Sequence, residues 1–219
     1  LGSLLPALLF GVAVGNILRG IPIDGQGHFT GTFLGLLNPY SLLVGLLSVA
    51  MCVMQGAAYL VGKSEGAHQE WVRRWAKGAW LAFLLLYAAS LAASVPAGPH
   101  LFAAAWANPL CWLFAVLFVA GLAVFPGALG QGRWGRVFLA SSTTVGALLG
   151  MAAVGLFPRL VPSSLNLDWS LTIYNAASSQ KTLTVMLVIA LIGMPLVIGY
   201  TVFIYRVFRG RVVLTEDSY

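Results

Sequence analysis

The side chains that could do chemistry in this sequence lie almost entirely outside its apolar stretches. All twelve Lys and Arg residues, all six Asp and Glu residues and the three histidines fall in the gaps between those stretches or at their ends. Catalysis or transport inside a membrane usually places ionisable residues within the helices, because burying charge there is costly without a purpose. The sequence therefore argues against a proton pump or ion-coupled transporter formed by this chain alone.

Haem ligation is the next chemistry to consider, because histidine and methionine are common axial ligands. His28, His68 and His100 are all in gaps, which argues against a bis-histidine haem between the helices. Without a histidine partner in the apolar stretches, packing is the favoured role of the methionines there. These methionines are Met51, Met54, Met151, Met186 and Met194. We expect no catalytic, cofactor-binding or metal-binding residue in this chain.

The two cysteines do not have the spacing of metal ligands. Cys52 and Cys111 lie in different apolar stretches and are expected to be buried thiols that pack as small hydrophobic groups. We do not expect them to be joined, because Cys52 lies past the middle of its helix whereas Cys111 lies near the start of its own. The sequence also contains no Walker loop, zincin motif or set of nucleophile, histidine and acid.

The elements that carry these residues are expected to be transmembrane helices. Of the 219 residues, 59% are hydrophobic and 8% are charged, whereas a soluble domain carries about 25% charged residues. Charge this sparse cannot cover a water-facing surface, so much of the surface must face lipid. The net charge of +6 is distributed over short gaps. Because nucleic-acid binding needs clustered Lys and Arg, no nucleic-acid partner is expected.

The uncharged stretches predict an all-α fold, a polytopic membrane helical bundle that forms a single domain over residues 1–219. Each stretch approaches or exceeds the ~20 residues that a helix needs to cross the hydrocarbon core. The gap at residues 64–77 could form a short interfacial helix; a solvated amphipathic turn is the favoured interpretation, with an anionic-lipid site as the alternative. About six spans follow, near residues 1–18, 39–62, 79–95, 103–125, 137–158 and 182–205.

The distribution of Lys and Arg predicts the orientation. Nine of them lie in the gaps after the second and fourth spans and in the C-terminal tail, and three lie in the other gaps. Basic residues accumulate on the cytoplasmic side of membrane proteins. We therefore predict a cytoplasmic C-terminal tail, with Asp168 in a long outer loop.

Small and polar residues within the spans are assigned to packing. Gly11 with Gly15, and Gly146 with Gly150, are spaced to let helix backbones approach closely. Polar side chains can hydrogen-bond between helices, at about 0.6 kcal/mol each on average. They are Asn16, Gln55, Ser90 and the run of hydroxyl residues at 141–144.

Four segments, in order along the chain, carry a family resemblance. They are Gly11–Asn16 running on to Arg19–Pro22, then Phe29–Pro39, then Met54–Tyr59, and last Phe157-Pro158, Pro162-Ser163-Ser164 and Ser170–Gln180. In sequence and order they closely resemble subunit II of the cytochrome bd-type quinol oxidases, and they cover most of the chain.

The resemblance implies a role in aerobic respiratory electron transfer in the bacterial inner membrane. Enzymes of this family oxidise quinol and reduce oxygen to water, with protons released and consumed on opposite sides of the membrane. The resemblance implies that haems b and d and the quinol site belong to a larger partner, subunit I. This chain is then a non-haem subunit that scaffolds and stabilises subunit I, with membrane lipids and a small single-helix subunit as further expected partners.

The resemblance starts partway along the family's sequence. Family members carry several helices before the position of Leu1, and their acidic, proton-conducting residues lie there. We therefore expect the N-terminal helices of the family to be missing here, consistent with an apolar start that lacks an initiator Met. No proton-path residue is assigned.

Two other classes remain as alternatives to the oxidase subunit. A multi-helix transporter or channel subunit would show buried charge or broken half-helices near the middle of the membrane, and the predicted spans have neither. A purely structural assembly factor is the third possibility.

Overall fold

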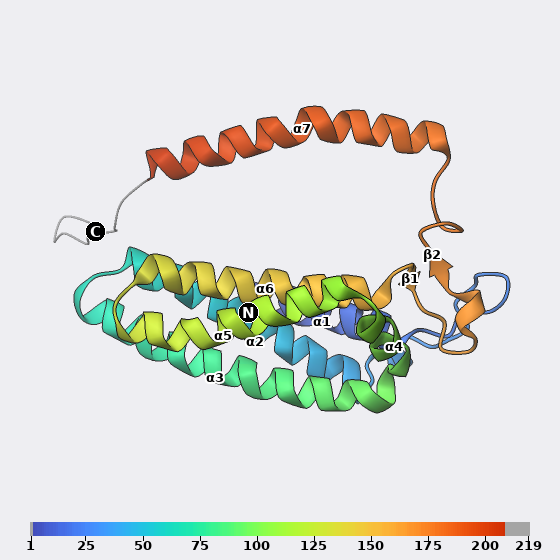
Figure 1. The fold of residues 1–219 in the computed structure, drawn as a ribbon, viewed down its shortest axis with the longest axis horizontal. Helices are drawn as coiled ribbons and strands as arrows, with labels where there is room; N and C mark the ends of the chain where they lie inside the picture. Colours follow the sequence, from blue (N-terminus) through green and yellow to red (C-terminus); the bar gives the residue numbers. More distant parts are fainter. Residues whose placement is uncertain (1, 209–219) are drawn as a thin grey trace.

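The computed structural model describes residues 2–208, apart from the side chains of Ala104, Trp106 and Ala107. Helices dominate this part of the chain, and most of them lie side by side in one elongated bundle (Figure 1). The α-helices are α1 (Leu4–Arg19), α2 (Pro39–Lys63), α3 (Gly66–Ala97), α4 (Pro99–Ala107), α5 (Pro109–Gly130), α6 (Trp134–Leu156) and α7 (Gln180–Val207). Two 3-10 helices, η1 (Leu34–Leu36) and η2 (Leu167–Trp169), and two strands, β1 (Arg159–Val161) and β2 (Leu171–Thr172), complete the structure.

Five of these helices are long and apolar enough to cross a membrane: α2, α3, α5, α6 and α7. Helix α1 is apolar but has only 16 residues, fewer than the expected span at residues 1–18. The prediction of a polytopic helical membrane protein is confirmed. The short β1–β2 antiparallel pair, which lies at one end of the bundle, was not predicted.

Asparagine–proline pairs set where two helices begin. Asn38 caps α2 by accepting a hydrogen bond from the Ser41 N–H at 3.0 Å, as its position before Pro39 suggested. Asn108, in an extended conformation before Pro109, caps α5 in the same way. The helical conformation is disfavoured for a residue that precedes proline. The expected span at residues 103–125 is therefore interrupted at Asn108. Its first residues belong to the short helix α4.

Helix α3 begins earlier than expected. The solvated turn predicted for residues 64–77 is wrong, because the chain is helical from Gly66 onward and α3 runs for 32 residues. The side chain of Gln69 stabilises the corner by donating to the carbonyls of Val61 at 2.9 Å and Ser64 at 2.7 Å. These hydrogen bonds satisfy carbonyls at the C-terminal end of α2.

The core lies between α2, α3, α5 and α6. Phe83 of α3 is fully buried there, with ring centroids 6.2 Å from Phe118 and 6.3 Å from Tyr87. The indole N–H of Trp80 also joins α3 to α5 by donating to the Leu122 carbonyl at 3.2 Å. Aromatic packing therefore dominates the contact between α3 and α5.

Glycines bring α1 and α2 together, as predicted for Gly11 and Gly15. A Cβ atom on Gly11 would lie 2.7 Å from the Gly45 Cα and 2.9 Å from the Val44 carbonyl oxygen, and one on Gly15 would lie 2.8 Å from the Ser41 Cα. These contacts are with backbone, which cannot move aside as a flexible side chain can. The close approach of α1 and α2 therefore depends on glycine.

Replacing Gly11 by alanine is expected to destabilise the protein by about 1–3 kcal/mol, because the new methyl group overpacks the α1–α2 contact. The measurement is thermal unfolding of the purified protein in mild detergent. Gly56→Ala on α2 is the matched control, since no atom lies within 4 Å of its added Cβ. Equal losses of stability in the two variants would contradict the packing described.

Helix α7 stands apart from the bundle (Figure 1). None of its residues is buried, and all but Gly193 and Ile204 are classed as exposed. Its side chains are apolar all around the helix, so water cannot be its solvent. Helix α7 requires lipid or other helices around it.

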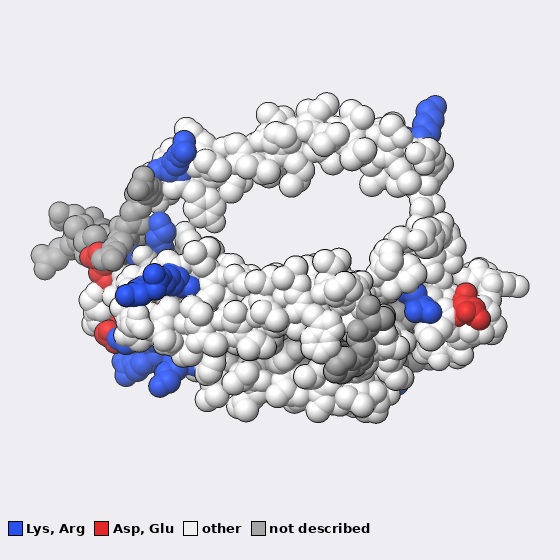
Figure 2. Space-filling view, in the orientation of Figure 1, with Lys and Arg blue, Asp and Glu red and all other residues white. Residues whose placement is uncertain are grey.

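Lys and Arg gather at one end of the bundle. Figure 2 shows most of them together at the end where α2 leads into α3 and α5 into α6. Arg206 is in the last turn of α7, and Figure 1 shows this end of α7 at the same end of the molecule. Arg19, Arg159 and Lys181 lie on segments of the opposite end. The described Lys and Arg residues thus gather mostly at one end, as the alternation along the sequence predicted. Arg209 and Arg211 lie outside the described residues.

Candidate functional site

The three histidines lie on three different segments. His28 is in the loop between α1 and α2, where its Nδ1 is 3.8 Å from the Asp24 carboxylate. His68 lies in the first turn of α3 and stacks on Trp71, with ring centroids 5.9 Å apart. His100 lies at the start of α4. Within residues 2–208, no group of three or more His, Cys, Asp or Glu side chains is arranged to hold a metal ion.

The methionines also differ in their surroundings. Met54 is 1% exposed in the α2 core, and Met51 packs against that core with Met151 of α6. Met186 and Met194 lie exposed on α7. His28 lies in a loop, His100 lies at the start of the short helix α4, and His68 lies in the first turn of α3, so none of them is in the middle of a long apolar helix. The positions of Met51, Met54 and Met151 fit packing, the role favoured from the sequence, whereas Met186 and Met194 lie outside the described core.

Both cysteines are free thiols, but their burial differs from the expectation. Cys52 is exposed on α2, and Cys111 is half-buried near the start of α5. The expectation that both thiols are buried is wrong for Cys52. A surface that faces lipid accepts a small apolar group as readily as a protein core does, so sequence alone could not tell the two positions apart.

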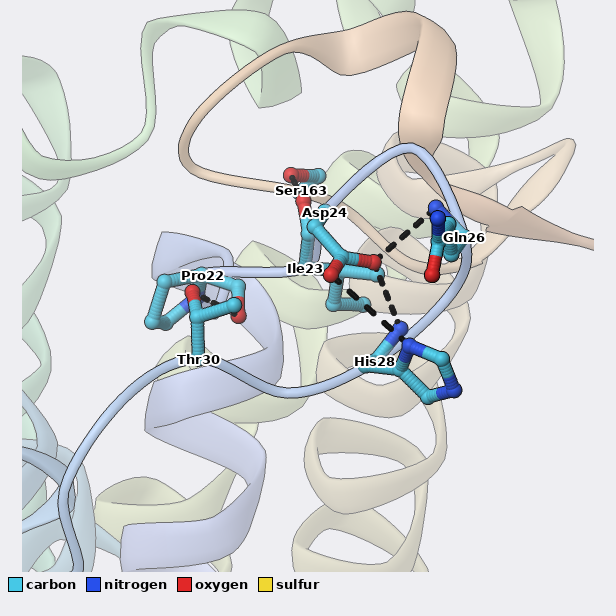
Figure 3. A network of polar contacts seen from close by, with 7 residues as sticks. All are labelled: Pro22, Ile23, Asp24, Gln26, His28, Thr30 and Ser163. Carbon is cyan, nitrogen blue, oxygen red and sulfur yellow. Dashed lines mark hydrogen bonds and ion pairs between the residues drawn. The ribbon is translucent and has the colours of Figure 1, made fainter.

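A compact turn follows α1 at the end of the bundle opposite the cluster of Lys and Arg, the end predicted to face outward (Figure 3). The Asp24 carboxylate accepts hydrogen bonds from the backbone N–H groups of Gln26 and His28, each at 2.9 Å. The hydrogen bond from the His28 N–H lowers the pKa of Asp24 below its ordinary value. Thr30 then turns the chain back, with its N–H 3.0 Å from the Pro22 carbonyl. This pairing keeps the loop compact.

Ser163 holds that turn against the loop after α6. Its hydroxyl, which is buried, donates to the Ile23 carbonyl at 2.7 Å, across 140 residues of sequence (Figure 3). Its N–H donates to the Ser170 hydroxyl at 3.0 Å. The Pro162-Ser163-Ser164 and Ser170–Gln180 segments that carried the resemblance therefore help to form a structured outer platform, defined here as residues 20–38 and 157–179.

Asn16 joins the end of α1 to this platform. Its buried amide donates to the carbonyls of Val12 at 2.9 Å and Leu36 at 2.7 Å, and its oxygen accepts from the Asn38 amide at 2.9 Å. Deeper in the bundle, the Gln55 amide donates to the Ser142 hydroxyl at 2.8 Å and links α2 to α6. These hydrogen bonds confirm that Asn16 and Gln55 hold elements together. They bring no nucleophile beside a base.

Sequence reasoning missed the hydroxyl pair between α2 and α3. The Tyr40 and Ser94 hydroxyls lie 2.9 Å apart, and Ser94 also donates to the Ser90 carbonyl at 2.7 Å. The Ser90 hydroxyl is buried and has no hydrogen-bond partner within residues 2–208. The four-residue spacing of Ser90 and Ser94, which places them on one face of a helix, was the available signal.

Comparison with known proteins identifies relatives of one kind. The sequence model of the family described as cytochrome bd terminal oxidase subunit II matches residues 1–208. Cytochrome bd-I ubiquinol oxidase subunit 2 of Escherichia coli K12 is 32% identical over 97% of the chain. Cytochrome bd ubiquinol oxidase subunit 2 of Bacillus subtilis is 29% identical over 96% of it.

The chain matches only part of each relative. It spans 64% of the length of the Escherichia coli protein and 62% of the Bacillus subtilis protein. A structure of bd oxidase from Geobacillus thermodenitrificans has a similar fold, with a TM-score of 0.76 at 19% identity. That match covers 94% of this chain and 62% of the other.

Proposed function

Since the chain belongs to the family of cytochrome bd terminal oxidase subunit II, we propose that it is the non-haem subunit of a quinol oxidase. The complex oxidises quinol and reduces oxygen to water in a bacterial inner membrane. The observation that carries the proposal is the family match, which extends over residues 1–208. The polytopic helical fold supports it.

In this proposal, haems b and d and the quinol site belong to a partner, subunit I. The residues of this chain fit a haem poorly. A membrane haem takes axial ligands such as histidine or methionine from within the bilayer, whereas His28 and His100 lie at the outer end and His68 lies at the basic end. Met54, the most deeply buried methionine, is enclosed by core side chains. We therefore assign this chain no step of the reaction.

The role left to the chain is to support its partner. Helix α7 and the outer faces of α5 offer apolar surfaces that need lipid or protein around them. Gly146 has open space around it and remains a site where a partner helix could approach closely. Gly150 does not, because a Cβ there would lie 2.7 Å from the Phe114 ring of α5. Gly150 instead packs against α5 within the bundle.

A transporter or channel subunit is the weaker alternative. Such proteins place charged or polar sites near the bilayer midplane. Here the buried polar groups within the bundle, such as Asn16 and Gln55, are neutral amides that bond to neighbouring elements.

The proposal predicts that haem accompanies this chain through purification. An affinity tag on the chain, extraction in mild detergent and a reduced-minus-oxidised absorbance spectrum are the measurement. Haem bands in proportion to the tagged chain are expected, together with quinol-dependent oxygen consumption. The same purification from untagged cells is the control. Intact chain that purifies without any haem-bearing subunit would contradict the proposal.

A further inference from the structure

A large cleft opens at the outer end of the bundle. Its volume is about 840 Å³, and its walls come from the end of α1, the starts of α2 and α4, the end of α3 and the loop after β1. Arg19, Asn38, His100 and Asn166 are among the lining residues. These residues supply polar groups to walls that are otherwise mainly apolar, and the cleft borders the outer platform.

The charge in this cleft is positive and uncompensated. Arg19 forms no ion pair with any acidic side chain of residues 2–208. The Nε2 atom of His100 is buried and has no hydrogen-bond partner among the same residues. Burial lowers the pKa of His100, the positive charge of the nearby Arg159 lowers it further, and a hydrogen bond with the Leu18 backbone opposes both effects. An anion in the cleft would compensate the positive charge of Arg19. It would also favour the protonated form of His100, which can donate a hydrogen bond from Nε2.

Two helices also begin at the cleft. Pro39 at the start of α2 and Pro99 at the start of α4 both line it. Helix N-termini carry partial positive charge and favour negatively charged groups, phosphates above all. The cleft thus combines a guanidinium, an imidazole nitrogen without a partner and two helix N-termini.

An apolar cavity of about 320 Å³ adjoins the cleft and extends along α1, α2, α3 and α6. Tyr40 lines both spaces, so they meet at its side chain. The walls of the cavity are almost entirely apolar and include Phe10, Leu47, Leu148 and Ala152. Such a space suits a hydrocarbon chain and not water.

Hydroxyl groups mark the boundary between the two spaces. Ser94 and Ser90 line the apolar cavity and follow one another down α3, within about 10 Å of Ala97 at the cleft by the helical rise of ~1.5 Å per residue. Ser94 is paired with Tyr40, but the Ser90 hydroxyl is more than nine-tenths buried and unpartnered. A buried donor without an acceptor is costly, so a ligand carbonyl in reach of Ser90 would be stabilising.

From the order of these groups we infer that the cleft and cavity together bind an anionic phospholipid. Its phosphate lies beside Arg19 and His100, an ester carbonyl accepts a hydrogen bond from Ser90, and an acyl chain fills the apolar cavity. Charge-assisted hydrogen bonds from Arg19 hold the phosphate. The inference does not depend on the oxidase assignment, because it uses only the groups of this chain.

The test is phospholipid retention by the full chain, purified from native membranes with the subunits that accompany it. After exhaustive detergent exchange, bound phospholipid is extracted into chloroform and identified by mass spectrometry. The native protein is expected to retain anionic phospholipid, and the double variant Arg19→Gln/His100→Gln is expected to lose it. Lys181→Gln/His28→Gln is the matched control, since it removes one basic side chain and one histidine at the same end, outside the cleft. This control is expected to retain the lipid.

Two further variants keep the test decisive. Ala152→Phe fills the apolar cavity without changing charge and is expected to release the lipid, whereas Arg19→Lys keeps the charge and is expected to retain it. Size-exclusion chromatography verifies that each protein remains intact. If the bound phosphate is inorganic, it stays in the aqueous phase during extraction, and the Ala152→Phe variant still binds it. That result would overturn the inference in favour of a free anion. Retention of a neutral prenyl lipid in equal amounts by the native protein and by Arg19→Gln/His100→Gln would also overturn it.

Discussion

Replacing Phe83 by alanine is expected to cause the largest loss of stability of any single truncation in the core. Phe83 is fully buried and contacts the rings of both Phe118 and Tyr87, so its removal leaves a cavity where α3 meets α5. Soluble cores lose about 3–5 kcal/mol on such a change. We expect a loss at the lower end of that range, because the competing environment is lipid, which is nearly as apolar as the core.

The loss is measured as a fall in the midpoint of thermal unfolding in mild detergent. Phe33→Ala is the matched control, because the Phe33 side chain is 76% exposed and lines neither the cleft nor the apolar cavity. The control is expected to change stability by no more than about 0.5 kcal/mol. Similar midpoints for the two variants would show that Phe83 does not occupy the core.

A reporter enzyme fused after Tyr219 is expected to be active in the cytoplasm and inactive outside it. Nine of the twelve Lys and Arg residues belong to one side of the membrane by sequence, and those that the structure describes lie mostly at one end of the bundle (Figure 2). Because basic residues stay on the cytoplasmic side, that end and the tail are expected to be cytoplasmic.

The opposite pattern is expected for a reporter inserted in the outer platform. Residue Gln26, in the exposed turn after α1, is a suitable position because the loop there has open space around it at Gly27. A reporter that folds only outside the cytoplasm should be active at Gln26 and silent after Tyr219. Activity outside the cytoplasm after Tyr219 would reverse the orientation.

The sequence predicted those parts of the fold that depend on local signals. Asn38-Pro39 begins α2, Gly11 and Gly15 bring α1 and α2 together, and uncharged stretches became long apolar helices. Asn108-Pro109 carries the same signal as Asn38-Pro39, but it lies inside an apolar stretch whose length predicts a single span. A cap signal inside an apolar stretch deserves as much weight as one at its edge.

The parts that could not be predicted depend on contacts between distant residues. The hydrogen bond from Ser163 to the Ile23 carbonyl joins positions 140 residues apart, and the Tyr40–Ser94 pair joins positions 54 apart. The cleft at Arg19 and His100 exists only because the end of α1 lies beside the start of α4. No pattern within either segment indicates its partner. Sequence could name these side chains but not bring them together.

The central claim is that this chain binds no haem iron and stands beside a subunit that does. Its most direct test is the reduced-minus-oxidised spectrum of the purified complex after His28→Ala, His68→Ala and His100→Ala, each made singly. The positions of these histidines, outside the middle of the bilayer, predict that every haem band persists in each variant at the intensity of the unaltered complex. Loss of a haem band in one variant whose complex remains assembled would contradict the account and identify that histidine as an iron ligand.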